Sequence, residues 1–196
     1  MPLPIRPKHP TRGVAAAALL ALAGALISCG SEEPAVPDDA GERARAALAP
    51  FKKDLAEALG AALREGGPVQ AIEVCRLEAP RIAAATARDG IEIGRTSHRL
   101  RNPENAPPPW TEPLLREYVA NPADEAPRVV RIDAGHVGYV EPIRVKPLCL
   151  GCHGEQVAAP VQDRLRELYP GDRATGFREN EFRGLFWVKL PERDAA

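Results

Sequence analysis

Residues 149–153 read Cys-Leu-Gly-Cys-His and place two thiols and an imidazole at fixed spacing. Two thiols separated by two residues can each add across one vinyl group of a porphyrin, and the histidine that follows then lies under the ring with a nitrogen aimed at the iron. A redox dithiol usually opens a helix in a βαβ unit, and a zinc site needs further ligands at matching spacing; neither context is evident. Cys149, Cys152 and His153 are therefore predicted to hold one covalent haem c, with His153 as an axial ligand.

The N-terminus has the pattern of an exported lipoprotein. Three basic residues precede an apolar run at positions 14–27, which is too short to span a bilayer comfortably, so a signal peptide is favoured over a membrane anchor. The run ends at Ser28-Cys29-Gly30, which resembles a bacterial lipobox, where the cysteine sulfur carries diacylglycerol. An ordinary signal peptide with an incidental cysteine is the alternative, but no A-x-A-like site lies near the end of the run. We therefore predict lipidation of Cys29.

Lipidation of Cys29 determines the predicted location and domain organisation. The protein is expected in the cell envelope, held to a membrane by its lipid and facing the periplasm. Gly30, rather than Asp, after the cysteine favours the outer membrane in a Gram-negative cell. The predicted parts are a lipoprotein signal peptide at 1–28, a flexible tether rich in Pro, Asp and Glu at 29–41, and a haem-binding domain at 42–192.

Composition excludes one class of partner. The formal net charge is −1, and no Lys/Arg-rich cluster with interleaved aromatic residues occurs. A nucleic-acid partner is therefore not expected. The chain that remains after signal cleavage is long enough to bury a single-domain core.

Apolar periodicity predicts helices and strands without βαβ repetition. Helices are predicted at 42–63, 68–88, 111–120 and 160–168, and strands at 91–95, 128–133, 136–145 and 184–190. Gly66-Gly67 ends the first helix, and Pro68 suits the first position of the second. The predicted fold class is α+β, an antiparallel sheet flanked by helices.

The first predicted helix carries an apolar stripe at Ala44, Leu48, Phe51, Leu55, Ala58 and Ala62. Such a stripe could form the seam of a homodimer. It covers barely three heptads, so packing against the protein's own core is the favoured interpretation.

Elimination reduces the number of candidates for the second axial ligand. Met1 is the only methionine and leaves with the signal peptide, so the His/Met pair of electron-carrying cytochromes c is impossible. The remaining candidates are Cys75, His98, His136, a lysine, water or nothing. The other three cysteines have assigned roles, which leaves Cys75 as an unpaired thiol on an apolar helix face. Alternatively, Cys75 is a small buried apolar residue with no role at the iron. From the residues alone, Cys75 therefore ranks only slightly ahead of the other candidates for the second axial ligand.

The order of several short motifs resembles a known family. The motifs are AIEVC at 71–75, IGRTS at 93–97, RNPEN at 101–105, CxxCH at 149–153, Tyr169-Pro170, ATGF at 174–177 and Arg183-Gly184. Together they resemble the haem-c-binding, PAS-like domain family, long catalogued as a domain of unknown function and found alone or in front of bacterial signalling modules. The resemblance covers about residues 42–190.

The family resemblance implies a PAS-like fold with one covalent haem and a distant cysteine facing the CxxCH histidine. Carried onto this sequence, His153 is one axial ligand and Cys75 the other. One departure is visible: the turn before the last strand usually has Gly followed by an acid, whereas this chain has Asn180 followed by Glu181. Because Asn tolerates the left-handed conformation, we expect the turn to persist.

A basic stretch offers partners for the haem propionates. Arg95, Arg99 and Arg101 are candidates, with a solvated basic stretch as the equal alternative. A thiolate ligand would stabilise ferric over ferrous iron and lower the reduction potential.

Three function classes remain: a redox or small-ligand sensor, an electron carrier at the membrane surface, and a haem enzyme. No acid–base constellation accompanies the haem motif, so the enzyme is not favoured. Because the chain contains no output module, a sensor must report to a separate protein partner. We predict a membrane-anchored sensor, with a low-potential electron-transfer cytochrome c as the alternative.

Overall fold

The computed structural model describes residues 35–192, so the predicted signal peptide and Cys29 lie outside the described part. In chain order the elements are α1 (Ala40–Thr86), β1 (Glu92–Thr96), α2 (Glu112–Ala120), β2 (Arg128–Asp133), β3 (His136–Arg144), α3 (Leu150–His153), α4 (Ala159–Leu168) and β4 (Phe182–Pro191). Among these residues, no helix combines the length and apolarity needed to cross a membrane.

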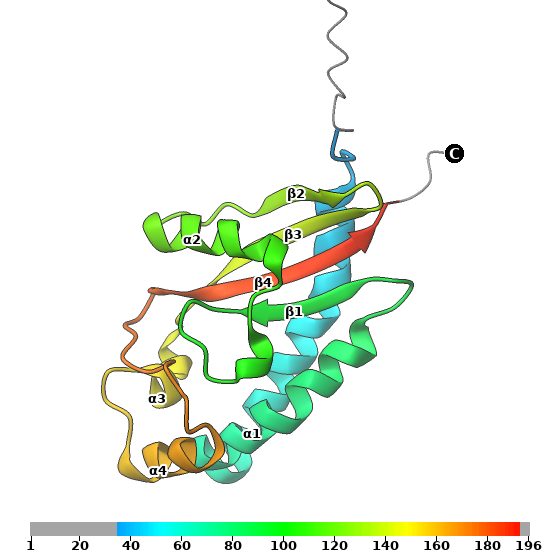
Figure 1. Ribbon diagram of the computed structural model, residues 1–196. Coiled ribbons are helices and arrows are strands. Elements are labelled where there is room, and N and C mark those ends of the chain that lie inside the picture. The colour runs from blue at the N-terminus through cyan, green and yellow to red at the C-terminus, as the bar shows by residue number, and fades with distance from the viewer. Residues whose placement is uncertain (1–34, 193–196) are drawn as a thin grey trace, which may run out of the picture. The chain divides into compact units, whose positions relative to one another are not determined.

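The described strands form one antiparallel, four-stranded sheet in the order β1-β4-β3-β2 (Figure 1). β4, the last strand in the chain, pairs with β1, the first, and Arg95 lies opposite Phe186 in their register. This long-range pairing brings the residues after β1 to the start of β4, where the Ser97 hydroxyl donates a hydrogen bond to the Arg183 carbonyl at 2.6 Å. The loop after β1 is thereby fixed at the end of the sheet that carries α3.

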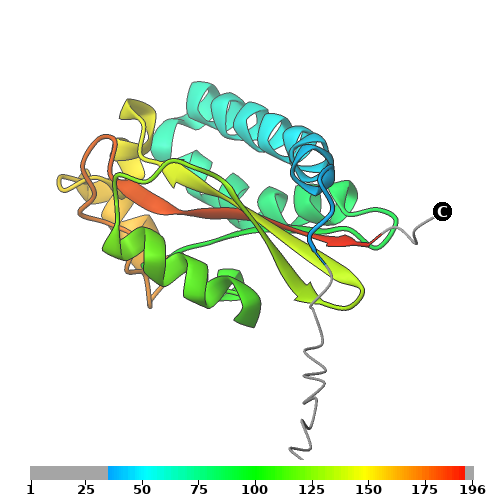
Figure 2. The same cartoon turned by 90° about the horizontal axis from the view of Figure 1, so that it is seen from above.

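α1 and α2 cover opposite faces of the sheet (Figure 2). The core under α1 contains Ala44, Leu48, Phe51, Ile93, Tyr139, Val188 and Leu190. The core under α2 contains Leu114, Leu115, Tyr118, Val140, Phe182 and Leu185. Adjacent residues Tyr139 and Val140 thus serve opposite faces, as the two-residue period of a strand requires. Four residues of the predicted apolar stripe, Ala44, Leu48, Phe51 and Leu55, belong to or pack against this core, which agrees with the interpretation favoured from the sequence.

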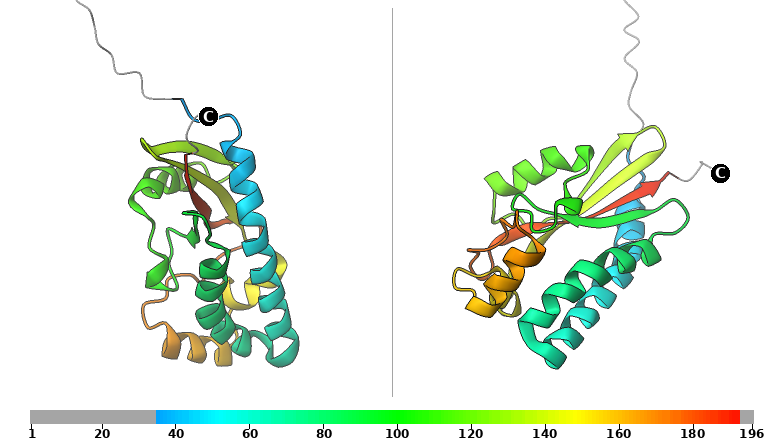
Figure 3. Two further views of the ribbon diagram at one scale, coloured as in Figure 1. Left: turned by 90° about the vertical axis from the view of Figure 1, so that its right-hand side faces the viewer. Right: turned by 60° about the horizontal axis from the view of Figure 1, so that its bottom comes forward.

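Gly67 divides α1 into two helical halves that fold back on each other (Figure 3). Its backbone angles, φ 66° and ψ −162°, are strained for any residue with a side chain, and Pro68 directly follows as the first residue of the second half. The Gly-Gly-Pro sequence therefore makes the turn that was expected. The second half carries Cys75 towards α3 rather than away from it.

The predicted α+β class and antiparallel sheet are confirmed. Element ends differ by small steps: α1 begins at Ala40, inside the predicted tether, and β4 begins at Phe182, two residues before its predicted start. Asn180 adopts φ 62°, so the turn before β4 persists with Asn in the left-handed conformation, as expected.

Candidate functional site

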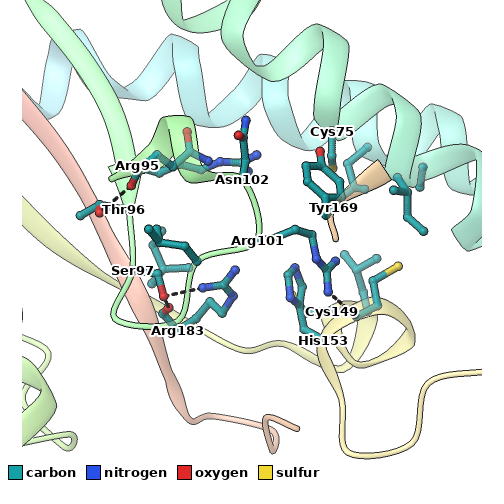
Figure 4. A pocket seen from close by; sticks show the side chains of 18 of the residues that line it. Cys75, Arg95, Thr96, Ser97, Arg101, Asn102, Cys149, His153, Tyr169 and Arg183 are labelled. Atoms are coloured by element: carbon teal, nitrogen blue, oxygen red, sulfur yellow. Dashed lines mark hydrogen bonds between the residues drawn. The ribbon is translucent and has the colours of Figure 1, made fainter. Parts of the chain in front are cut away.

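A cavity of about 210 Å³ lies where the two halves of α1, the loop after β1, α3 and the start of β4 meet. Its lining includes six of the seven residues predicted to bind the haem, namely Cys75, Arg95, Arg101, Cys149, Cys152 and His153, and leaves out Arg99. These come from three segments far apart in the chain, and Figure 4 labels all of them except Cys152. The structure therefore brings the predicted site together in one place.

The CxxCH segment forms a tight turn of helix. A 3-10 turn at Pro147–Cys149 continues directly into α3, so both cysteines and the histidine project from consecutive helical turns. Cys149 and Cys152 form no disulfide with each other or with Cys75. The backbone N–H of Phe177 donates to the His153 carbonyl at 2.9 Å, which fastens α3 to the segment before β4. Both thiols are consequently available for thioether bonds.

His153 is oriented by its own hydrogen bond. Its Nδ1 lies 2.6 Å from the carbonyl oxygen of Ala174, and because a carbonyl only accepts, Nδ1 carries the proton and Nε2 keeps its lone pair. Burial, followed by the charges of Arg101 and Arg183, holds the pKa of His153 well below its usual value. A neutral imidazole whose Nδ1–H donates to a carbonyl and whose Nε2 keeps its lone pair suits an axial metal ligand.

Cys75 lies on the second half of α1 and is half-buried. Figure 4 shows Cys75 and Tyr169 on one side of the cavity and Cys149 and His153 on the other. Ile72, one turn before Cys75, packs with Tyr169, Val161 and Leu165 in a small core that steadies this part of α1. Burial, followed by the nearby Cys75, raises the pKa of Tyr169.

The two histidines that competed with Cys75 do not line the cavity. His98 stacks on Phe182 with ring centroids 5.6 Å apart. His136 lies at the β2–β3 hairpin, where its Nδ1 is 2.8 Å from Asp133 Oδ1. The lining also includes no lysine. Among the described residues, Cys75 is therefore the one candidate side chain for a second ligand that lines the cavity, and it lies opposite His153 (Figure 4).

The cavity is positively charged. Arg95, Arg101, Arg144 and Arg183 line it, and among the described residues 35–192 no carboxylate side chain does. Burial, with repulsion from Arg101 and Arg95, lowers the pKa of Arg183 to about 10. Buried cations are costly without a counter-charge, so this lining fits a ligand that carries carboxylates, as haem does.

The three predicted arginine partners differ in their surroundings. Arg95 lines the cavity, whereas Arg99 stacks on the Phe177 ring at 4.0 Å and is absent from the lining. Arg101 lines the cavity, but its guanidinium also bonds Asp172 and the carbonyls of Cys152 and Ala174.

Sequence reasoning placed Arg183-Gly184 among the family motifs but gave Arg183 no role at the site, because strand pairing, not spacing, brings it there. The available signal was Gly184, beside it: a Cβ at Gly184 would lie 2.1 Å from the Thr96 carbonyl oxygen, so only glycine permits β4 to approach the end of β1 so closely. Arg183 is held there by Nη1 donating to Ser97 Oγ at 2.6 Å.

The fold and the site define a class of protein: a single antiparallel sheet between helices, with a cationic pocket containing CxxCH at one end. The chain belongs to the Tll0287-like family, whose model matches residues 36–191. It is similar to the crystal structure of the cyanobacterial heme-protein Tll0287, with 25% identity and a TM-score of 0.57 over 83% of this chain and 100% of that one. No curated protein sequence matches it. The resemblance drawn from the motifs to a haem-binding family is thus confirmed.

Proposed function

We propose that this chain is a c-type haem protein with one covalent haem, bound through Cys149 and Cys152 and ligated by His153 and Cys75. The observation that carries the proposal is the convergence of these four residues on one cavity with no acidic lining residue. The similarity to a heme-protein over the whole of that protein's length supports it.

Each group in the cavity has a distinct task in this proposal. The bound haem supplies a redox-active iron. The hydrogen bond from His153 to Ala174 keeps Nε2 directed away from the carbonyl and ready to ligate. Arg95 and Arg183 provide charge for the propionates, and the apolar wall, which includes Leu59, Leu63 and Phe186, excludes water.

We further propose a role as a redox or small-ligand sensor in the cell envelope, anchored through lipid on Cys29. Two protein ligands leave no open position for substrate turnover, and departure of Cys75 from iron would free the second half of α1 to move. The resemblance to PAS-like signalling domains supports this role, and the signal passes to a separate protein partner.

Electron transfer at low potential is the second candidate. Leu148 lines the cavity, immediately precedes Cys149 and is 56% exposed, which places one edge of the pocket at the surface. Such an exposed edge is what electron exchange with another protein requires. A carrier keeps one ligand set in both redox states, whereas a sensor changes it.

The first test is co-expression with a haem c maturation system. Haem should stay with the polypeptide on a denaturing gel, and Cys149→Ser or Cys152→Ser should weaken attachment. Wild-type protein that loses all haem on denaturation contradicts the proposal.

Carbon monoxide separates the two roles. Binding of carbon monoxide to the reduced protein, with loss of the Cys75 ligand, supports a sensor. A spectrum that does not change on addition of carbon monoxide, in either redox state, supports a carrier.

The lipid anchor is tested by Cys29→Ser, which should move the protein from the membrane to the soluble fraction.

A further inference from the structure

An ion pair between Arg101 and Asp172 lies beside the CxxCH turn. Arg101 Nε is 3.1 Å from Asp172 Oδ2, and the two side chains are only 12% and 11% exposed. A buried pair of this kind gains little net stability, because desolvation of both charges offsets their attraction. The contacts of Arg101 and Asp172, rather than any gain in stability, therefore indicate the role of this ion pair.

The pair holds Ala174, the residue whose carbonyl orients His153. Arg101 Nη2 donates to the Cys152 carbonyl at 2.6 Å and to the Ala174 carbonyl at 3.3 Å. That same Ala174 oxygen accepts the His153 Nδ1–H at 2.6 Å. Asp172 Oδ1 accepts the Ala174 N–H at 2.7 Å. Arg101 and Asp172 thus bind the C=O and N–H of one residue, whose oxygen is the partner of His153.

We propose that Arg101 is a positioning residue for His153 and that, with Asp172, it sets how strongly this imidazole donates electrons to a bound haem iron. This inference rests on the proposed haem function. A carbonyl that accepts from Nδ1–H makes an imidazole a better donor. Because Arg101 donates to the same oxygen, it draws charge from that oxygen and limits the effect.

Arg101 and Asp172 should shift the midpoint potential of the iron in opposite directions. Arg101 favours ferrous iron, since a nearby positive charge disfavours the more positive ferric state. Asp172 neutralises part of that charge. Removal of Arg101 also frees the Ala174 oxygen to bind Nδ1–H more strongly, which again favours ferric iron. Removal of Arg101 should therefore lower the midpoint potential both through the lost charge and through the lost hydrogen bond.

The experiment compares Arg101→Gln, Arg101→Lys and Asp172→Asn by redox titration of the holoprotein. Arg101→Gln should lower the midpoint and Asp172→Asn should raise it, each by about a tenfold change in the ferric-to-ferrous ratio, or about 59 mV for one electron. Arg101→Lys keeps the positive charge, so its midpoint potential should stay close to that of the wild type. Ferric EPR g-values should shift for Arg101→Gln.

The matched control is the Arg131–Glu192 pair, which joins β2 to the end of β4 and contributes nothing to the cavity lining. Its Arg131→Gln and Glu192→Gln variants should leave the midpoint unchanged. Shifts of equal sign in Arg101→Gln and Asp172→Asn, or shifts no larger than the controls, overturn the inference. If Arg101→Gln does not fold, Asp172→Asn and Arg101→Lys still decide it.

Failure of the proposed haem function and failure of the role of Arg101 and Asp172 give different results. Wild-type protein without covalent haem, or with haem not bound by His153, contradicts the proposed function before any variant is compared. Wild-type protein with His153-ligated haem, but without opposite shifts in the two variants, contradicts only the role of Arg101 and Asp172.

Discussion

Arg183 shows how far individual residues could be assigned from the sequence. The thiols and imidazole of CxxCH were predictable because their chemistry depends on spacing within one turn. Arg183 stands in one of the family motifs, but its role could not be assigned, because its place beside Ser97 arises from the pairing of the first strand with the last. The sequence also assigned Arg101 to the propionates, and this stays a prediction, whereas the structure adds its bonds behind His153.

We expect Arg183→Gln to make the midpoint potential depend on pH. If Arg183 pairs with a haem propionate, as proposed, its guanidinium holds the pKa of that carboxylate low, and removal of the guanidinium should raise this pKa. Ionisation stabilises ferric iron, so the variant's midpoint should fall as pH increases, while the wild type changes little. Redox titration at several pH values measures this, with exposed Arg116→Gln on α2 as the control. Parallel pH curves for wild type and Arg183→Gln would refute the assignment.

At the scale of elements, the break in α1 was predictable and its consequence was not. Gly66-Gly67-Pro68 marks the end of one helix and the start of another, because only Gly readily adopts the required angles and Pro suits the first turn. The direction of the second half depends on packing against α4, through contacts such as Ile72 with Val161. Local propensity contains no information about such contacts.

Replacement of Gly67, between the two halves of α1, should change the stability of the fold in the opposite direction from replacement of Gly60, which lies within the first half. Gly67→Ala forces a side chain into strained angles and should destabilise the fold by about 1–3 kcal/mol. Gly60→Ala lies within the helix, where its Cβ comes no closer than 3.4 Å to the flexible Arg64 side chain, and should stabilise it by about 0.5–1 kcal/mol. Urea unfolding of both variants measures the difference. Equal effects would mean that Gly67 is not a strained hinge.

At the scale of the whole molecule, one sheet packs against helices on both of its faces, and the cationic pocket lies at one end of it. The α+β class followed from the absence of βαβ repetition. The strand order did not, because placing β4 between β1 and β3 depends on pairings between distant segments. Arg131 ties the first and last described residues together, since it bonds the Ala35 carbonyl and Glu192.

Global stability should fall at alkaline pH partly through Tyr139 in the core under α1. Burial, followed by its hydrogen bond to Glu141, raises the Tyr139 pKa to about 12, against about 10 in an unfolded chain. A raised pKa means that the protonated phenol stabilises the fold fully below about pH 10, and that this contribution, up to about 2–3 kcal/mol, is lost as pH rises to about 12.

Tyr139→Phe should therefore lose less stability than the wild type between those pH values. Chemical unfolding of both proteins at matched pH measures the two slopes, and titration of other groups cancels in the comparison. Identical slopes would show that the Tyr139 hydroxyl has a normal pKa.

Ferric EPR and optical spectra of wild-type and Cys75→Ala holoprotein test the central claim most directly, because they report which atom faces His153 across the iron. Wild type should show a low-spin, thiolate-ligated ferric haem. Cys75→Ala should lose that signature and show a higher midpoint potential, with the covalent haem retained. Identical spectra in the two proteins would remove Cys75 from the iron and contradict the account.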